Sequence, residues 1–481
     1  MSNFYERQLL WLTGTCVFSL FVEHQVSKRK QASNADARRE KGSSTMLSTL
    51  MRQYLVVYAI VMCADWLQGP YVYSLYREQY GFPERLVAVL FVTGFMSAGL
   101  TAPLVGAWAD QYGRRRLCLV FCVTYTITCC CILFPFLPIL LCGRIFGGIS
   151  TSILFSAFES WVVSASQSMG LPQSDLSMIL GRATLVNGFV AAGSGVVSNQ
   201  LVGYTSSFAS PFVASGALLV LSYVVIRGTW SENFGNSSEA GAAAVTGDLF
   251  QTRRLGQAWR IVQKDPLLLV LGFTQTCFEG GMYLFVFLWV PSLQEASLSN
   301  KLPLGYIFSA FMVSMMLGSL LYTVITTHFA PPVPNSQLPN PSSTNTQNDK
   351  ADTSLTLHAK LSSSVCAASA LALAISVTSQ SEYTRFWAFC AFEACVGMYY
   401  PVQGMLRGTL ISNEHRATLS ALFRVPLNVF VVVSLLTGVS SARYAVLSAT
   451  SLMLAVSSIL TGVVIVGKAD TVRDGGRPLR G

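Results

Sequence analysis

Charged side chains are scarce in this sequence: they make up 11% of its 481 residues, whereas hydrophobic residues make up 52%. A soluble globular domain carries roughly 25% charged residues, so a soluble fold is excluded. Apolar runs of about 18 residues or more recur along the whole chain, and each is long enough to cross a hydrocarbon layer about 30 Å thick. We therefore predict a helical protein that crosses the lipid bilayer many times.

The sequence also lacks the patterns of enzymes that use metals, nucleotides or disulfides. The four histidines are scattered, and the twelve cysteines lie nearly all inside apolar runs, without the spacing of a zinc site or a disulfide framework. No G-x-x-x-x-G-K-[ST] loop is present, so direct use of ATP is not expected. We predict that the chain is not an enzyme and binds no cofactor and no metal.

The net charge of +9 raises the question of nucleic-acid binding. The Lys and Arg residues, however, lie mostly in short segments between apolar runs, where the positive-inside rule places them. These segments fall on one side of the membrane if both ends of the apolar core are cytoplasmic. We expect a multi-pass protein of the cell membrane with a cytoplasmic C-terminus, no nucleic-acid partner and no obligate protein partner.

Twelve spanning helices are predicted from the apolar runs. A polar break after the sixth divides them into two six-helix halves, as in secondary transporters that bind substrate at the midplane between repeats. The predicted fold is therefore all-α, with two six-helix bundles around a central cavity. The predicted ranges are 52–76, 86–109, 117–136, 137–163, 176–202, 210–227, 265–291, 303–327, 355–379, 383–408, 416–438 and 442–466.

The stretch LLWLTGTCVFSLFV, residues 9–22, is a further apolar segment, either an extra helix or the apolar part of a signal peptide. No small-residue cleavage site follows it, and the basic stretch SKRKQASNADARREK favours a retained helix. The predicted domains are 1–51 (N-terminal helix and basic linker), 52–227 (first bundle), 228–264 (cytoplasmic loop), 265–466 (second bundle, with a disordered loop at 328–354) and 467–481 (cytoplasmic tail).

Apart from Asp265 at the start of a span, four acidic residues lie inside the predicted spans: Asp65, Glu159, Glu279 and Glu393 occupy helices 1, 4, 7 and 10, the first of each three-helix group. An ionised side chain at a helix centre costs about 2.5–3.5 kcal/mol, so it must face the bundle interior or water and find a partner. A carboxylate shielded from water also binds a proton more readily. Asp65, Glu279 and Glu393 are therefore predicted as cavity acids or proton carriers.

Arginine and asparagine recur at matching places in the two halves. Helix 5 contains GRATLVN, with Arg182 and Asn187, and helix 11 contains FRVPLN, with Arg424 and Asn428. A guanidinium stays charged and offers a fork of donors that matches the oxygens of an oxyanion. The two arginines are predicted to clamp a small dianion, with the asparagines adding hydrogen bonds. Alternatively, acids and arginines neutralise one another and lock the helices together.

The loop between helices 2 and 3 reads GAWADQYGRRR, residues 106–116. It resembles the G-x-x-x-D-[RK]-x-G-[RK]-[RK] signature of the major facilitator superfamily, although Gln111 replaces the usual basic residue. The resemblance implies a cytoplasmic latch between this loop and the acid at the end of helix 4. A basic loop that only sets the topology is the alternative. The latch residues would be Gly106, Asp110, Gly113, Arg114 and Glu159.

Several longer segments narrow the resemblance. ADWLQGPYVYSLY, GRIFGGISTSILFSAFESW, FEGGMYLFVFLWVP, PLGYIFSAFMVSMMLGS and LFRVPLN are similar to the molybdate-anion transporter family of that superfamily, over about residues 50–465. The resemblance implies a major facilitator fold and the uptake of molybdate, a tetrahedral dianion that the predicted arginines suit. The alternatives are a transporter of the same fold for another anion or a small organic solute, and a membrane sensor that binds its ligand without transport.

Overall fold

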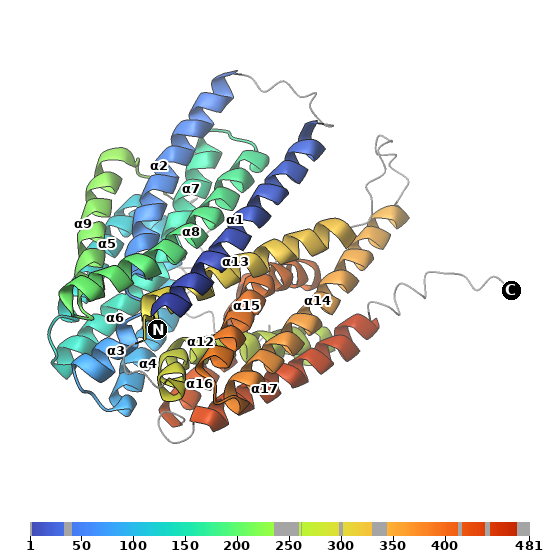
Figure 1. Cartoon of the computed structure of the whole chain (residues 1–481). Helices are drawn as coiled ribbons and strands as arrows, with labels where there is room; N and C mark the ends of the chain where they lie inside the picture. The colour runs from blue at the N-terminus through green and yellow to red at the C-terminus, as the bar shows by residue number, and fades with distance from the viewer. Residues whose placement is uncertain are drawn as a thin grey trace. The chain divides into compact units, whose positions relative to one another are not determined.

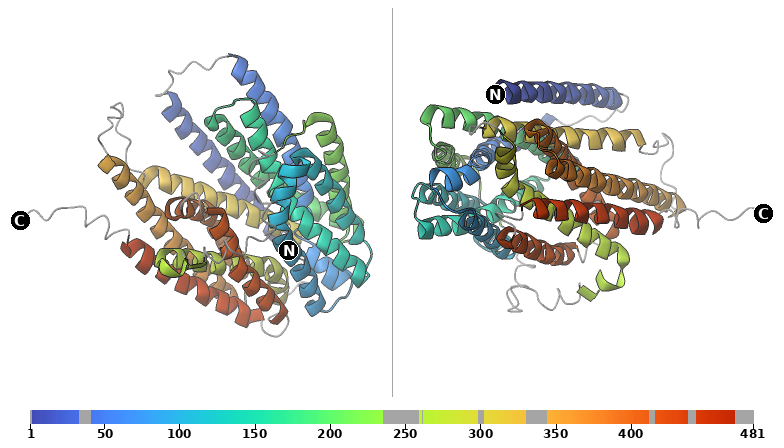
Figure 2. Two further views of the ribbon diagram at one scale, coloured as in Figure 1. Left: turned by 180° about the vertical axis from the view of Figure 1, so that it is seen from behind. Right: turned by 60° about the horizontal axis from the view of Figure 1, so that its bottom comes forward.

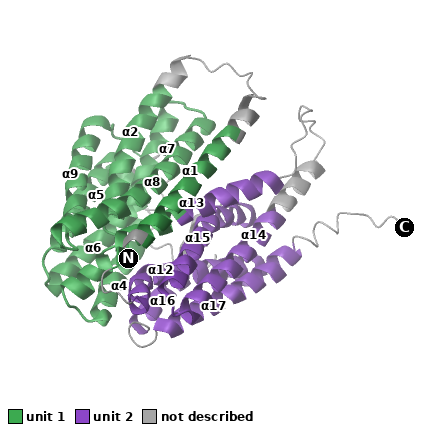
Figure 3. Cartoon of the chain, in the orientation of Figure 1, with its two compact units in different colours: residues 1–251, 301–313 green, residues 252–300, 314–481 purple. Residues whose placement is uncertain are grey.

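The computed structural model describes residues 2–32, 41–234, 259–260, 262–297, 302–329, 344–411, 416–437 and 443–468. The described residues form helices, turns and short connections, without a strand, so the all-α prediction is confirmed. The chain divides into two compact units: unit 1 comprises residues 1–251 and 301–313, and unit 2 comprises residues 252–300 and 314–481 (Figure 3).

Unit 1 contains the helices from the N-terminus to residue 229 and the first turns of α13 (Figure 1). These helices are α1 (Ser2–Ala32), α2 (Lys41–Trp66), α3 (Val72–Ser74), the π-helical η1 (Leu75–Gln79), α4 (Glu84–Tyr112), α5 (Arg114–Cys131), α6 (Leu137–Leu154), α7 (Ala157–Ser168), α8 (Gln173–Thr205) and α9 (Ser210–Thr229).

Unit 2 contains the remaining helices, which Figure 2 shows from two further sides. They are α12 (Pro266–Ala296), α13 from residue 314 (the whole helix is Leu304–Phe329), α14 (Thr344–Thr378), α15 (Glu382–Leu410), α16 (Arg416–Thr437), α17 (Arg443–Leu460) and the π-helical η2 (Thr461–Val466).

Each of the twelve predicted spans corresponds to helical structure. Among the described residues, nine helical stretches are long and apolar enough to cross a membrane, with Leu422–Thr437 of α16 as a shorter apolar helix. The helices α5 and α15 are more polar, because α5 begins with three arginines and α15 carries acidic and amide side chains. Both helices nevertheless pack against other helices of the same unit.

Two of the predicted continuous helices are interrupted. The segment 52–76 leaves the α-helix after Trp66, at a turn that contains Gly69 and Pro70, and becomes helical again at Val72. Proline cannot donate to the preceding turn and its ring clashes with it, which explains the break. The segment 137–163 is divided into α6 and α7 at Phe155 and Ser156, and no proline or glycine stands at this second break.

The predictions for loops and tails fall largely outside the described residues, at 235–258, 330–343 and 469–481. Helix α14 nevertheless begins at Thr344, inside the loop 328–354 that was expected to be disordered. After Pro341 the chain has no proline or glycine up to the end of α14, so no helix breaker opposes this extension. The predicted domain boundaries stay a prediction.

Small residues let neighbouring helices approach closely. At Gly148 of α6, an added Cβ would lie 2.7 Å from the backbone nitrogen of Ala98 in α4. The Ser152 hydroxyl donates to the Ala98 carbonyl at 2.7 Å beside this crossing. In unit 2, an added Cβ at Gly397 of α15 would collide with the backbone oxygen of Met315 in α13. Close backbone approach and hydroxyl hydrogen bonds replace the hydrophobic effect as the force between helices in lipid.

The segment after α9 closes over the start of α5. The Glu232 carboxylate accepts hydrogen bonds from the backbone N–H groups of Arg115, at 2.9 Å, and Arg116, at 3.1 Å. Such groups at a helix N-terminus have no partner within the helix, and a negative charge suits the helix dipole there. Gly113 precedes them with a φ of +99°, and a Cβ on it would lie 2.6 Å from Glu232.

Two tryptophans hold this segment in place. The rings of Trp161 and Trp230 stack with their centroids 3.8 Å apart and an interplanar angle of 10°. The indole N–H of Trp161 donates to the Ser231 carbonyl at 2.9 Å, and the Asn233 amide donates to the Trp161 carbonyl at 3.0 Å. The segment 230–234 thereby joins α5 to α7 within unit 1.

We predict that Glu232→Ala destabilises the protein by about 1 kcal/mol, because removal of a capping side chain leaves the first N–H groups of α5 unpaired. The thermal unfolding midpoint of the purified chain in detergent measures this. Glu23→Ala, which removes a carboxylate from α1, is the control and should leave the midpoint unchanged. Equal midpoints for the wild type and Glu232→Ala would contradict the capping role.

Candidate functional site

In unit 1, Asp65 lies in α2 and accepts a hydrogen bond from the hydroxyl of Tyr125 in α5 at 2.6 Å. One turn further along, the Gln68 amide donates to the Ser215 hydroxyl of α9 at 2.8 Å, and Ser215 donates to the Ala64 carbonyl. A polar cluster therefore joins α2, α5 and α9 inside the apolar bundle. Asp65 is half-buried and its carboxylate receives this hydrogen bond from a neutral donor.

Asn187 of α8 lies beside the same part of α2. The indole N–H of Trp66, the residue after Asp65, donates to the Asn187 side-chain oxygen at 2.8 Å. The structure thus brings the predicted asparagine against the residue that follows the predicted acid. Trp66 was not predicted, and an aromatic residue next to an intramembrane acid is the signal that could have suggested it.

Arg182 of α8 is exposed, and its guanidinium lies 3.1 Å from the sulfur of Met51 in α2. A cavity of about 220 Å³ lies between α2, α6, α7 and α8 in unit 1. Arg182 is not one of its lining residues, although Leu180, Ala183 and Thr184 of the same helix are. The lining residues are Tyr54, Tyr58, Met62, Leu154, Phe155, Phe158, Glu159, Leu180, Ala183 and Thr184.

In unit 2, Glu279 of α12 forms an ion pair with Arg407 of α15, with 3.0 Å between Oε1 and Nη2. The Tyr399 hydroxyl donates to the same carboxylate oxygen at 3.4 Å, and the Gln275 amide donates to the other oxygen at 3.3 Å. Sequence reasoning missed Arg407. Its signal was the four-residue spacing of Tyr399, Gln403 and Arg407, which places all three on one face of α15.

The other predicted residues of unit 2 are not among the described hydrogen-bond partners of this ion pair. Arg424 of α16 is exposed, and Asn428 follows one turn later on the same helix with partial burial. Glu393 of α15 is 5% exposed. Glu279 and Glu393 therefore differ in environment: Glu279 is paired with a guanidinium, whereas Glu393 is buried and is in none of the described ion pairs.

The residues of the predicted latch are placed as follows. Gly106 and Asp110 lie in α4, and the Asp110 side chain is outside the described part of the structure. Arg114 donates to the Ser160 carbonyl of α7 at 3.2 Å, one residue beyond Glu159. Glu159 itself is exposed and lines the 220 Å³ cavity. The carboxylate that caps this loop is Glu232, which was not predicted, and the latch stays a prediction.

Arg144 of α6 is a further cation within unit 1. Its guanidinium carbon lies 5.0 Å from the centroid of the Tyr76 ring and 5.3 Å from that of Phe91, so two aromatic faces stabilise its charge. Its Nε and Nη2 atoms are buried without a hydrogen-bond partner. From the sequence, Arg144 could not be distinguished from an ordinary arginine near a helix end, because the two rings beside it come from other helices.

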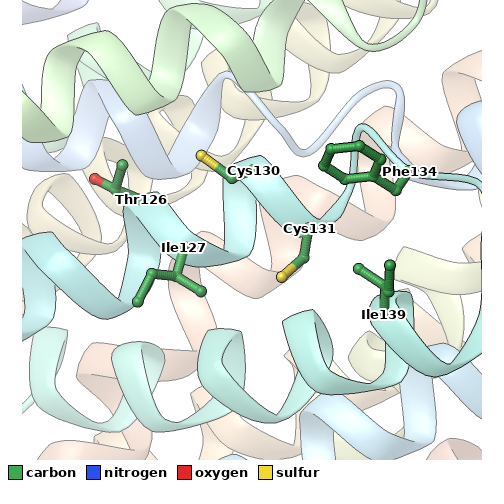
Figure 4. A pocket seen from close by; sticks show the side chains of 6 residues that line it. All are labelled: Thr126, Ile127, Cys130, Cys131, Phe134 and Ile139. Atoms are coloured by element: carbon green, nitrogen blue, oxygen red, sulfur yellow. The ribbon is translucent and has the colours of Figure 1, made fainter.

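A second hollow of about 270 Å³ lies on α5 and α6 (Figure 4). Its walls are almost entirely apolar, and the Thr126 hydroxyl already donates to the Cys122 carbonyl at 2.7 Å. A dianion would lose its hydration there without gaining donors, so this hollow does not suit an anion. Its lining residues are Thr126, Ile127, Cys130, Cys131, Phe134 and Ile139.

Among the described residues, no group of three or more His, Cys, Asp or Glu side chains is arranged to hold a metal ion. The candidate functional groups in both units are carboxylate, guanidinium and amide side chains, which lie within helices of membrane-spanning length.

The comparisons with known proteins agree with this fold. Residues 11–331 match the model of a family described as sugar transporters with 12 transmembrane segments. Among solved structures, a mutant of the nucleoside transporter NupG has a TM-score of 0.64 at 9% identity, covering 86% of this chain and 99% of the other. A peptide transporter, POT, in complex with sulfate has a TM-score of 0.63 at 12% identity, covering 89% and 99%. These two show the fold alone.

Curated relatives are closer in sequence. The molybdate-anion transporter of Takifugu rubripes is 31% identical over 80% of this chain and 78% of its own length. That of Xenopus tropicalis is 32% identical over 79% of this chain and 76% of its own length. With the twelve helical segments and the transporter-like fold, these matches confirm the resemblance seen in the sequence: the chain belongs to the molybdate-anion transporter family and has the major facilitator fold.

Proposed function

We propose that the protein is a secondary active transporter that takes up molybdate across a membrane by alternating access. The observation that carries this proposal is the similarity, over about four-fifths of the chain, to relatives that are named molybdate-anion transporters. The cell membrane, a cytoplasmic C-terminus and the two-bundle domain division belong to the same proposal. The distribution of basic residues supports the cytoplasmic C-terminus, and the two compact units support the division into bundles.

Arg182 and Arg424 are the proposed anion-binding residues. Both are exposed, on helices α8 and α16 of the two bundles. A guanidinium that faces lipid is costly, whereas one that faces water or an anion is not. An oxyanion offers only acceptors, which the planar fork of donors of arginine matches. Asn187 and Asn428, on the same two helices, would add uncharged donors.

Asp65 is the proposed proton carrier. Its hydrogen bond comes from the neutral Tyr125 hydroxyl at 2.6 Å, and no neutralising cation is among its described contacts. A proton carrier must be able to exist without a permanent cationic partner, and Asp65 meets this condition among its described contacts. Glu279, by contrast, is paired with Arg407, and Glu393 is a second enclosed acid.

The latch is proposed as the loop from Gly106 to Arg114 acting with Glu159. The hydrogen bond from Arg114 to the Ser160 carbonyl supports a contact between this loop and α7. Opening of that contact would accompany the change of access to the substrate site.

Another anion, such as sulfate, or a small organic solute is the alternative substrate, because a fold does not determine its substrate. Cells that express the chain should accumulate labelled molybdate above control cells, and excess sulfate should compete poorly. Strong competition by sulfate would indicate that the protein transports several oxyanions and is not selective for molybdate. Accumulation equal to that of control cells would favour a membrane sensor.

We predict that Arg182→Ala or Arg424→Ala abolishes molybdate uptake while surface expression is kept, because each change removes donors for the dianion. Uptake and surface labelling are measured in the same cells. Arg227→Ala, which removes an exposed arginine from the last turn of α9, should retain uptake. Full transport by both site variants would assign these arginines a structural role.

We further predict that Asp65→Asn flattens the dependence of uptake on external pH, since an amide cannot carry the coupled proton. Tyr125→Phe should keep a pH dependence but shift it, because loss of the hydroxyl donor disfavours the ionised carboxylate. Initial uptake rates over a range of external pH provide the test. An unaltered profile in Asp65→Asn would remove this residue as the proton carrier.

A further inference from the structure

Three polar side chains of unit 2 donate hydrogen bonds to Glu279, and Gln403 lies between two of them on the same face of α15; we call these five residues the α12–α15 polar cluster. Helix α12 contributes Gln275 and Glu279, and helix α15 contributes Tyr399, Gln403 and Arg407. On each helix the members are four residues apart, so they lie on one face. None of the arginine or amide members of this cluster was among the predicted site residues.

Glu279 is the centre of the cluster. Its Oε1 lies 3.0 Å from the Arg407 guanidinium and 3.4 Å from the Tyr399 hydroxyl, and its Oε2 lies 3.3 Å from the Gln275 amide nitrogen. The Tyr399 ring is fixed by stacking on Phe278, with centroids 3.9 Å apart and an interplanar angle of 1°. A cation, a hydroxyl and an amide therefore converge on one position, which the carboxylate fills.

The cluster also contains buried polar atoms without a partner. These include the side-chain oxygen of Gln275, both polar side-chain atoms of Gln403 and the Nε of Arg407. Gln275 is 3% exposed and Gln403 is 1% exposed, so bulk water does not reach either amide freely. Buried polar groups in folded proteins almost always have partners, and an exception calls for a reason such as a bound ligand.

The remaining exposure lies on the ion pair itself. The Arg407 side chain is 26% exposed and the Glu279 side chain is 14% exposed. The guanidinium therefore keeps exposed surface, against which a small ion could bind, while it is paired with Glu279. The donors then available to it are the Arg407 N–H groups, the Gln403 amide and the Tyr399 hydroxyl once Glu279 releases it.

We infer that the α12–α15 polar cluster is a binding site for a tetrahedral oxyanion, with Arg407 and Gln403 as donors. Glu279 acts as an internal competitor that occupies the guanidinium until the anion displaces it. This inference rests on the proposed function for its ligand class, and it adds Arg407 and Gln403 to the proposed anion-binding residues Arg182 and Arg424. No bond is made or broken, because Arg407 only exchanges one oxyanion partner for another.

The competition makes an unusual prediction for Glu279→Gln. Removal of the competing charge should tighten molybdate binding about tenfold, whereas Arg407→Gln should weaken it about tenfold or more, because charge-assisted hydrogen bonds are the strong ones. Equilibrium binding of molybdate to the full chain purified in lipid nanodiscs measures both. Arg407→Lys keeps the charge without the fork and should bind with intermediate affinity.

A matched ion pair in the same unit provides the control. Arg443 lies 3.1 Å from Glu295 and also donates to the Pro291 carbonyl. Arg443→Gln removes the same charge from unit 2 and should leave the molybdate affinity unchanged. The double variant Arg407→Gln with Glu279→Gln leaves no unpaired charge, so it should fold even if Arg407→Gln does not. It should bind molybdate as weakly as the arginine variant.

The outcomes separate this inference from the proposed function. If the wild type accumulates molybdate in cells and the double variant binds it as tightly as the wild type, transport stands and this site is wrong. If Glu279→Gln weakens binding, the pair is a structural lock between α12 and α15, and the competitor role is overturned. If the wild type neither binds nor accumulates molybdate, both proposals fail.

Discussion

Each unit of this protein keeps a carboxylate inside an apolar helical bundle, and the rest of its polar structure depends on how that charge is compensated. In unit 1 the compensation is a neutral hydroxyl, from Tyr125 to Asp65 at 2.6 Å. In unit 2 it is a guanidinium, from Arg407 to Glu279 at 3.0 Å. An uncompensated charge at membrane depth would cost about 2.5–3.5 kcal/mol even on an insertion scale that includes relaxation.

The two kinds of compensation suit two different tasks. A carboxylate held by a neutral donor is not tied to a permanent positive charge, which is what proton coupling requires. A carboxylate held by a guanidinium occupies a group that an incoming oxyanion also prefers. On this proposal, Asp65 of unit 1 carries the proton, and the guanidinium that Glu279 occupies in unit 2 contributes to anion recognition together with Arg182 and Arg424.

Much of the fold could be predicted from the sequence, because apolar runs of spanning length and the basic segments between them are local signals. The break at Gly69 and Pro70 is also local, although the prediction ran a single helix through it. The start of α14 at Thr344 was missed because polar composition was taken as evidence of disorder, while the absence of proline and glycine was not weighed.

The candidate site was less predictable. An acid in an apolar run reveals that a partner must exist, but the partner comes from a helix far away in the sequence, such as Tyr125 for Asp65 and Arg407 for Glu279. The repeat pattern drew attention to Arg182 and Arg424, which match between the halves. Arg407, which bonds to Glu279, lacked such a match and was passed over.

An experimental structure of the full chain with tungstate, a heavy tetrahedral analogue of molybdate, tests the central claim most directly. The account predicts the anion within hydrogen-bond distance of an arginine guanidinium carried by α8, α15 or α16. If it lies against Arg407, that side chain should have turned away from Glu279. An anion bound with no arginine of these helices in contact would contradict the claim that guanidinium groups within the helices recognise the substrate.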